Sequence, residues 1–371
     1  MSRKLTPIRC TPQYYHKIWG GGRLAPTGGD KQIGEVWLLS ALAGQETPTE
    51  RLLQKSTVSQ SCLQDCLDFA ERMKRKALRV RSEGSIPPYV TEAESRKQHS
   101  DSPLCNSLTE GDDYEGASLD ALVSRYGDRL LGRGQTARCG GAFPLLIKLL
   151  DAATDLSVQV HPLPEKGGKD EIWYFLETEP TSRICLGLTE PMTADALRSA
   201  IERGDLMHYL HWEPVRPGEA IALPAGTIHA LGAGSMLIEV QDTSDTTYRL
   251  YDYDRVDDEG AKRTLHIEEA LRSATLEPHK LDARQLPLGT PRFVCHEVTA
   301  TPDSSQLITT DGTSCAILVG ISGSLLLSGE DTEQWQLAPH EALLLPAETL
   351  PMQVAPGEGK ALMITLTPTE L

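Results

Sequence analysis

The sequence predicts a mainly β protein made of two related β-barrel or double-sheet jelly-roll domains with a few helices. Short apolar segments, many with alternating polar residues, recur along the chain and are separated by turn residues. The phrase at 217–229, PGEAIALPAGTIH, also aligns without gaps with the phrase at 339–351, PHEALLLPAETLP. A repeated strand-turn-strand phrase of this kind indicates two related β units.

The expected elements support this class in chain order. They are strands within 17–22 and 34–40, an inserted helix at about 51–82, a mobile loop at about 83–117, a helix at 118–132, strands at 156–161 and 169–177, a helix at 193–204, and strands and turns from 217 onward. Ser118 and Thr193 have side chains that cap helix N-termini. We expect one domain over residues 1–270, with residues from about 51 to 117 as a partly flexible insertion, and a second domain over residues 271–371.

Charge and composition exclude several kinds of partner. The chain of 371 residues has 36 Lys and Arg against 52 Asp and Glu, a formal net charge of −16. Nucleic acids and anionic membranes need a basic surface, so neither is expected to bind. The N-terminus has no signal-like segment and no apolar run reaches the ~20 residues of a membrane helix, which predicts a cytoplasmic protein. The eight cysteines include no CxxC pair, so we expect most to be reduced.

Polar side chains alternate along the strand expected at 156–161. Ser157, Gln159 and His161 point to one face, and Leu156, Val158 and Val160 point to the other. This pattern suits a strand that lines a polar cavity. On the next strand, Lys169, Glu171 and Trp173 share a face, which brings a Lys and a Glu toward the same cavity.

A metal site is one interpretation of these residues. His161, Glu171 and His229 supply two imidazoles and a carboxylate, and Gln159 shares a strand face with His161. Zinc accepts such ligands, and one carboxylate among neutral ligands leaves a net charge near +1 that can stabilise an oxyanion. The alternative is that these are ordinary surface or hydrogen-bonded groups, since ligands spread over about 70 positions give a weak sequence signal.

Three further charged residues are candidates for the same cavity. Lys169 and Arg249 are the nearest cations, although a solvated Lys and an Arg paired with a nearby Asp are the simpler interpretations. Glu239 lies between apolar neighbours, and a buried carboxylate needs a partner or a shifted pKa.

Several phrases make the interpretation more specific. They are KIWGGGRLA at 17–25, SLDALVSRYGDRLLG at 118–132, FPLLIKLLDAATDLSVQVHP at 143–162, GGKDEIWYFLE at 167–177, LPAGTIHALGAG at 223–234 and EVQDTSDTTYRLYDYDR at 239–255. They resemble type I mannose-6-phosphate isomerases (phosphomannose isomerases) in their short bacterial form. The resemblance covers most of residues 12–50 and 118–270, and the C-terminal part matches only in its general cupin-like pattern. The family gives no guide to residues from about 51 to 117.

The resemblance implies a cupin fold and one Zn²⁺ per chain, in the first domain. The implied metal ligands are Gln159, His161, Glu171 and His229. The implied substrate-binding residues are Ser157, Lys169, Arg249, Asp245 and Trp19, and the implied catalytic residues are Arg249, Lys169 and Glu239. The second domain has Pro351 where His229 stands in the repeat, which agrees with a family that binds one metal.

The activity implied is interconversion of mannose 6-phosphate and fructose 6-phosphate through an enediol, by a monomer or homodimer. Such a reaction needs a general base near the sugar carbons, and Glu239, Lys169 and a zinc-bound hydroxide are all candidates. Two other functions stay open. One is an iron-dependent cupin oxygenase, because two His and a carboxylate also hold non-haem iron. The other is a non-catalytic cupin that binds a sugar phosphate.

Overall fold

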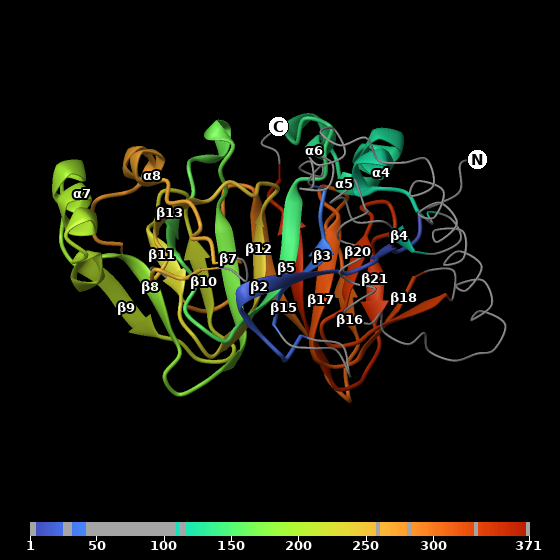
Figure 1. Cartoon of the computed structure of the whole chain (residues 1–371). Helices are drawn as coiled ribbons and strands as arrows, with labels where there is room; N and C mark the ends of the chain where they lie inside the picture. The colour runs from blue at the N-terminus through green and yellow to red at the C-terminus, as the bar shows by residue number, and fades with distance from the viewer. Residues whose placement is uncertain are drawn as a thin grey trace, which may run out of the picture. The chain divides into compact units, whose positions relative to one another are not determined.

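The computed structural model describes residues 5–24, 32–41, 109–110, 114, 116–256, 260–279, 284–329 and 333–368 (Figure 1). These residues form a mainly β structure with four larger antiparallel sheets, which confirms the predicted class. The expected inserted helix at about 51–82 lies outside the described residues, as does nearly all of the expected loop at about 83–117. A short sheet pairs β1 (Arg9–Cys10) with β4 (Thr109–Glu110).

Two of the sheets use strands from the first two thirds of the chain. The six-stranded sheet has the order β10 (Ala220–Leu223), β7 (Glu171–Thr178), β12 (Ser235–Asp242), β5 (Leu145–Ala152), β2 (Gln13–Gly21) and β3 (Ile33–Leu39). The five-stranded sheet has the order β13 (Tyr248–Tyr251), β6 (Val158–Val160), β11 (His229–Leu231), β8 (Arg183–Leu188) and β9 (Leu210–Pro214). Both sheets are open, so the double-sheet form holds here instead of a closed barrel.

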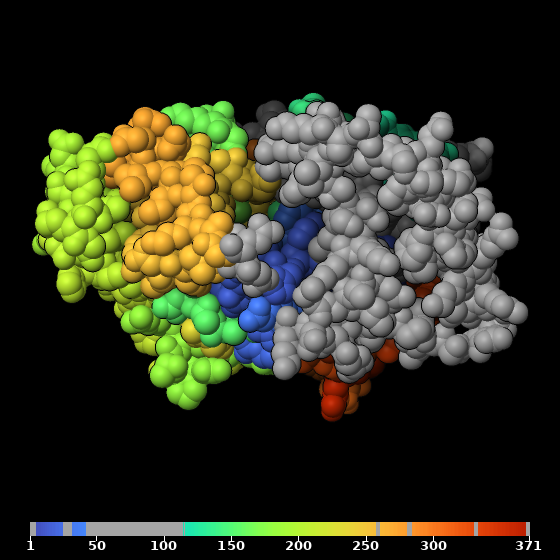
Figure 2. Space-filling view, in the orientation of Figure 1, coloured from blue at the N-terminus to red at the C-terminus, as the bar shows by residue number. Residues whose placement is uncertain are grey.

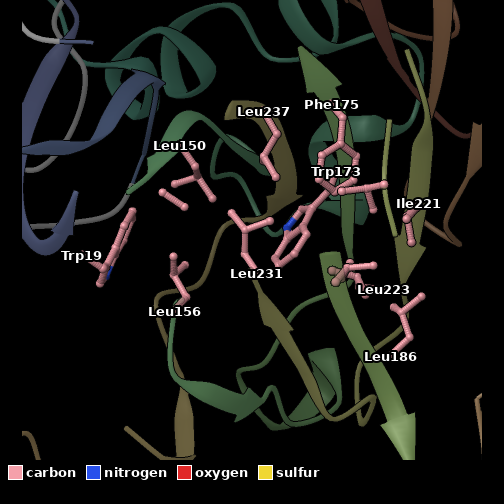
Figure 3. Packing of buried hydrophobic residues seen from close by; sticks show 13 residues of the cluster. Trp19, Leu150, Leu156, Trp173, Phe175, Leu186, Ile221, Leu223, Leu231 and Leu237 are labelled. Atoms are coloured by element: carbon pink, nitrogen blue, oxygen red, sulfur yellow. The ribbon is translucent and has the colours of Figure 1, made fainter. Parts of the chain in front are cut away.

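A hydrophobic core joins the inner faces of these two sheets. Trp173 and Leu237 come from the six-stranded sheet and Leu231 from the five-stranded one, and Figure 3 shows them close together. Trp19 belongs to the same cluster and lies at one side of it. Burying large apolar side chains between two sheets is the main contribution to the stability of such a layer.

Helices cover the outer face of the five-stranded sheet. Val158 and Val160 pack there with residues of α7 (Ala194–Glu202), η2 (Leu206–Tyr209) and α8 (Ile267–Ser273). The alternation predicted for this strand is therefore confirmed, with Gln159 on the opposite, inner face. Leu156 is an exception: it precedes β6 and packs in the inner core.

The other two sheets use strands from the C-terminal third. One has the order β14 (Leu288–Gly289), β15 (Phe293–Ala300), β22 (Gly359–Leu366), β17 (Ala316–Gly323) and β20 (Ala342–Leu345). Its partner has the order β16 (Gln306–Ile308), β21 (Met352–Val354), β18 (Leu325–Ser328) and β19 (Gln334–Leu337). A separate apolar cluster fills the space between them.

The repeated phrase occupies equivalent places in the two pairs of sheets. β10 and β20 are each edge strands, paired with β7 and β17 respectively. The turns before them also correspond, since Gly218 has φ of 84° and His340 has φ of 66°. The left-handed region is costly for a histidine, so the same turn is kept even where glycine is absent.

Short helices precede β5. They are α4 (Leu119–Tyr126), α5 (Asp128–Leu131) and α6 (Gln135–Arg138). A further short helix, η1 (Pro164–Lys166), follows β6. The helix expected at 118–132 is thus divided at Gly127, whose φ is 49°. Ser118 accepts a hydrogen bond from the Ala121 N–H and Thr193 accepts one from the Ala196 N–H, so both predicted caps are confirmed. No helix among the described residues is long and apolar enough to span a membrane.

Candidate metal and substrate site

Three predicted ligands meet between the sheets of the first pair. His161 follows β6 and His229 begins β11, both in the five-stranded sheet, while Glu171 begins β7 in the six-stranded sheet. One ligand atom from each lies within 4.8 Å of the others, and all three residues are buried. His161 Nε2 is 3.3 Å from Glu171 Oε1, and His229 Nε2 is 3.8 Å from Glu171 Oε2.

Backbone contacts leave the Nε2 atom of each histidine facing this group. The Nδ1 atom of His161 is 2.8 Å from the Thr246 carbonyl oxygen, and that of His229 is 2.9 Å from the Thr227 carbonyl oxygen. A carbonyl oxygen can only accept a hydrogen bond, so each Nδ1 carries the proton and is the donor. The same arrangement orients histidines that bind metals.

The lone pairs in this group suit a cation. Burial, and then the nearby Lys169, lower the pKa of His161 to about 3, so its Nε2 is unprotonated near neutral pH. Burial also lowers the pKa of His229. Among the described residues, His161 Nε2 and Glu171 Oε2 are buried without a hydrogen-bond partner. Unpartnered buried acceptors are costly, and a divalent cation would satisfy both, so these residues fit the expected metal.

Gln159 lies next to the histidines through strand pairing. In β6 it is opposite His229 of β11 on one side and Arg249 of β13 on the other. Its Nε2 is 3.3 Å from His229 Nε2, and its Oε1 accepts a hydrogen bond from the Ser157 hydroxyl at 3.2 Å. Rotating the amide by 180° would turn the oxygen toward the histidines. Its role as a fourth ligand remains a prediction.

A buried charged network adjoins the ligands. Lys169 Nζ is 2.9 Å from both Glu171 Oε1 and Gln241 Oε1. Lys148 Nζ donates to the same Gln241 oxygen at 2.8 Å and to Glu239 Oε1 at 2.9 Å. The second oxygen of Glu239 accepts from the indole N–H of Trp173 at 3.0 Å. Two ammonium groups therefore share one amide oxygen beside two carboxylates.

The sequence interpretation missed Lys148. It lies in the apolar run of β5, where every residue is buried, and a lone lysine in such a run is itself a signal of a buried partner. The strand register supplies that partner, because Lys148 is opposite Glu239. Lys169 was expected on a strand, but β7 begins at Glu171 and Lys169 reaches the site from the preceding turn.

Electrostatics favour the charged forms of Lys148 and Glu171. Burial alone would lower the pKa of Lys148, but Glu239 and Glu35 more than offset it and raise that pKa above its ordinary value. Burial likewise works against ionisation of Glu171, but Lys169 holds its pKa well below the ordinary value. Burial and the neighbouring Glu171 raise the pKa of Glu239.

Arg249 is a partly buried cation beside Gln159. Its Nε is buried and has no hydrogen-bond partner among the described residues. Burial, and then the charge of Arg263, lower its pKa, although it stays charged. An unpartnered guanidinium N–H near a polar site is suited to bind an anion.

A profile of the type I phosphomannose isomerase catalytic domain matches residues 93–181, the part of the chain that holds Gln159, His161 and Glu171. Residues 93–181 are therefore similar to the catalytic domain of that family. The resemblance seen in the sequence is thereby confirmed.

Curated relatives carry related names. The probable mannose-6-phosphate isomerase GmuF of Bacillus subtilis is 47% identical over 148 residues, which are 38% of this chain and 46% of GmuF. The mannose-6-phosphate isomerase of Streptococcus mutans is 42% identical over 170 residues, 44% of this chain and 52% of the relative. The matches to these two therefore span about half of the relatives' length.

Solved structures match over nearly the whole chain. The crystal structure of the mannose 6-phosphate isomerase from Bacillus subtilis has a TM-score of 0.70 at 25% identity, with 98% of this chain and 99% of that chain covered. A putative mannosephosphate isomerase from Archaeoglobus fulgidus has a TM-score of 0.68 at 20% identity, with 98% of each chain covered. These matches support the cupin-like fold expected from the resemblance to phosphomannose isomerases.

Asp245 and Trp19, also implied by the phosphomannose isomerase pattern, are not among the residues that meet at this group. Asp245 is exposed on the turn after β12, one residue before Thr246, which accepts from His161. Trp19 is buried in the apolar core. Figure 2 shows that the N-terminal strands (blue) also reach the surface on the same face as α8 (orange). Substrate contacts for Asp245 and Trp19 stay predictions.

Proposed function

We propose that this protein is a zinc-dependent mannose-6-phosphate isomerase. The observation that carries the proposal is the buried group of His161, Glu171 and His229, whose lone pairs converge beside Lys169. His161 and Glu171 also lie within the region that matches the family profile. His161, Glu171, His229 and Gln159 would hold the zinc. When bound, this ion would supply positive charge next to the sugar oxygens, where negative charge develops in the reaction.

The reaction needs balanced proton transfers and no oxidant. A base removes the proton on C2 of mannose 6-phosphate and returns a proton to C1, while O2 loses a proton and O1 gains one. The intermediate is an enediol. Glu239 is our choice for the carbon proton, because its carboxylate is buried in the charged network that adjoins the ligands. The Lys148 ammonium, whose Nζ is 2.9 Å from Glu239 Oε1, compensates the negative charge of this carboxylate.

Lys169 and Arg249 would bind and orient the sugar phosphate. Lys169 stands beside Glu171 and would stabilise charge on a sugar oxygen, while the unpartnered Nε of Arg249 would bind the phosphate or the enediolate. In a chain of formal charge −16, a dianionic substrate needs such local cations.

The test starts from protein purified without chelator. Metal analysis and conversion of mannose 6-phosphate to fructose 6-phosphate, followed by NMR, should give about one zinc per chain and turnover. Removal of metal by chelation should abolish turnover, and added Zn²⁺ should restore it. Iron together with oxygen consumption would favour an oxygenase instead. Binding of mannose 6-phosphate by zinc-replete protein without conversion would favour a non-catalytic cupin.

A further inference from the structure

A carboxylate at the end of β12 ties together the two segments that carry the charged network. Asp242 follows Gln241, whose amide oxygen binds Lys148 and Lys169. The Asp242 side chain accepts a hydrogen bond from the Asp170 N–H at 3.0 Å, and its own N–H donates to the Asp170 carbonyl at 3.2 Å. Asp170 stands between Lys169 and Glu171 in the chain, so this contact fixes the start of β7.

The charge of Asp242 is compensated from the other pair of sheets. Arg292, just before β15, places its Nε 2.7 Å from Asp242 Oδ1. Among the described residues, Oδ1 accepts no hydrogen bond, so this ion pair is its compensating contact. Asp242 is buried, whereas the Arg292 side chain is one-third exposed.

Arg292 is held firmly in this place. Its carbonyl accepts from the Thr367 N–H at 2.9 Å and its N–H donates to the Thr290 hydroxyl at 3.2 Å. The carbonyl of the preceding Pro291 accepts from Arg138 and Thr367. The backbone at Arg292 is therefore fixed by several hydrogen bonds, and this places its guanidinium next to Asp242.

We propose that Arg292 is a positioning residue: through Asp242 and the Asp170 N–H, the C-terminal sheets hold Lys169 and Glu171 in the geometry of the site. The C-terminal part of the chain, whose repeat lacks the histidine, would thereby have an indirect role at the site. The coupling itself stands without the proposed isomerase activity, whereas its effect on turnover depends on that activity.

The primary test is hydrogen exchange of the peptide that contains Asp170 in the full chain. Arg292→Ala leaves a buried carboxylate uncompensated, so exchange at residues 168–172 should rise about tenfold. In the double variant Arg292→Ala/Asp242→Asn, the uncharged amide oxygen can still accept from the Asp170 N–H, and protection should largely return. Arg129→Ala is the matched control, because it removes an ion pair with Glu348 and leaves Asp242 untouched.

Turnover is the second measurement. kcat for mannose 6-phosphate should fall about tenfold in Arg292→Ala with little change in KM, recover in the double variant, and stay unchanged in Arg129→Ala. Unchanged exchange in Arg292→Ala, or an equal rise in Arg129→Ala, would overturn the inference. A purely structural role would lower Tm in both arginine variants without selective exchange at residues 168–172. Absence of turnover in the wild type would reject the isomerase proposal, and the exchange result would still decide the coupling.

Discussion

His161 and Glu171 face each other from different sheets, with 3.3 Å between Nε2 and Oε1. The Nδ1–H of His161 donates a hydrogen bond to the Thr246 carbonyl, so its Nε2 faces the carboxylate with a lone pair. Lys169 Nζ is 2.9 Å from Oε1, but His161 Nε2 and Glu171 Oε2 have no hydrogen-bond partner among the described residues, so the site should be tested by metal content as well as by activity.

Loss of either histidine should remove metal and turnover together. In His161→Ala or His229→Ala, a buried ligand is lost from the zinc site, and we expect zinc per chain to fall at least tenfold in metal analysis after dialysis. His211→Ala is the control, since His211 is partly exposed and pairs with Glu213. Zinc content equal to wild type in both ligand variants would refute the assignment.

Loss of a substrate cation should separate metal binding from catalysis. Lys169→Ala and Arg249→Ala remove positive charge beside the ligands without removing a ligand. We expect near wild-type zinc content and a fall of about 100-fold in kcat/KM, as measured with mannose 6-phosphate. Retention of full turnover in either variant would exclude that residue from the reaction.

The buried Lys148–Glu239 pair predicts a specific pattern of stability. Lys148→Met leaves Glu239 as a buried charge and should cost about 3–5 kcal/mol in the free energy of unfolding. Adding Glu239→Gln removes that charge, so the double variant should regain part of the loss in urea titrations. Lys262→Met, which breaks an exposed pair with Asp254, should change stability by less than about 0.5 kcal/mol. Strictly additive effects at 148 and 239 would contradict the pairing.

The pH dependence of the metal-free protein follows from His161. Its pKa is about 3 in the folded state against an ordinary value of 6.5. Below pH 6.5 the unfolded chain therefore binds a proton that the folded chain does not, and stability should decline as pH falls from 6.5 toward 3. In His161→Asn the slope of unfolding free energy in this window should be smaller by up to about 1.4 kcal/mol per pH unit. Identical slopes in the two proteins would contradict a buried neutral histidine.

Gly168 should be intolerant of a side chain. A Cβ built on it would lie 1.6 Å from the Pro162 carbonyl oxygen, in the turn that joins His161 to Lys169. Gly168→Ala should shift this turn, lower Tm by several degrees and reduce zinc content. Gly22→Ala, where a Cβ meets nothing within 4 Å, should leave both unchanged. A Tm for Gly168→Ala within a degree of wild type would show that the turn adapts.

Much of the site was predictable because its residue types are unusual where they occur. Gln159 and His161 alternate with Val158 and Val160, and the strand period assigns the two sets to opposite faces. The repeat at 339–351 predicted a second unit, and its edge strand is found at the equivalent place. The face predicted for Leu156 was wrong, because this residue lies before β6 and its side chain packs in the inner core.

The sequence by itself determined the β class and which polar residue types stand on particular strands. Tertiary structure decided which of those groups touch. His229 lies opposite Gln159, Lys148 opposite Glu239, and Arg292 against Asp242, and in each pair the members are 50 to 91 residues apart. The physical reason is that local pattern sets the face of a side chain, whereas strand register and sheet packing, fixed by burial over the whole core, set its neighbours.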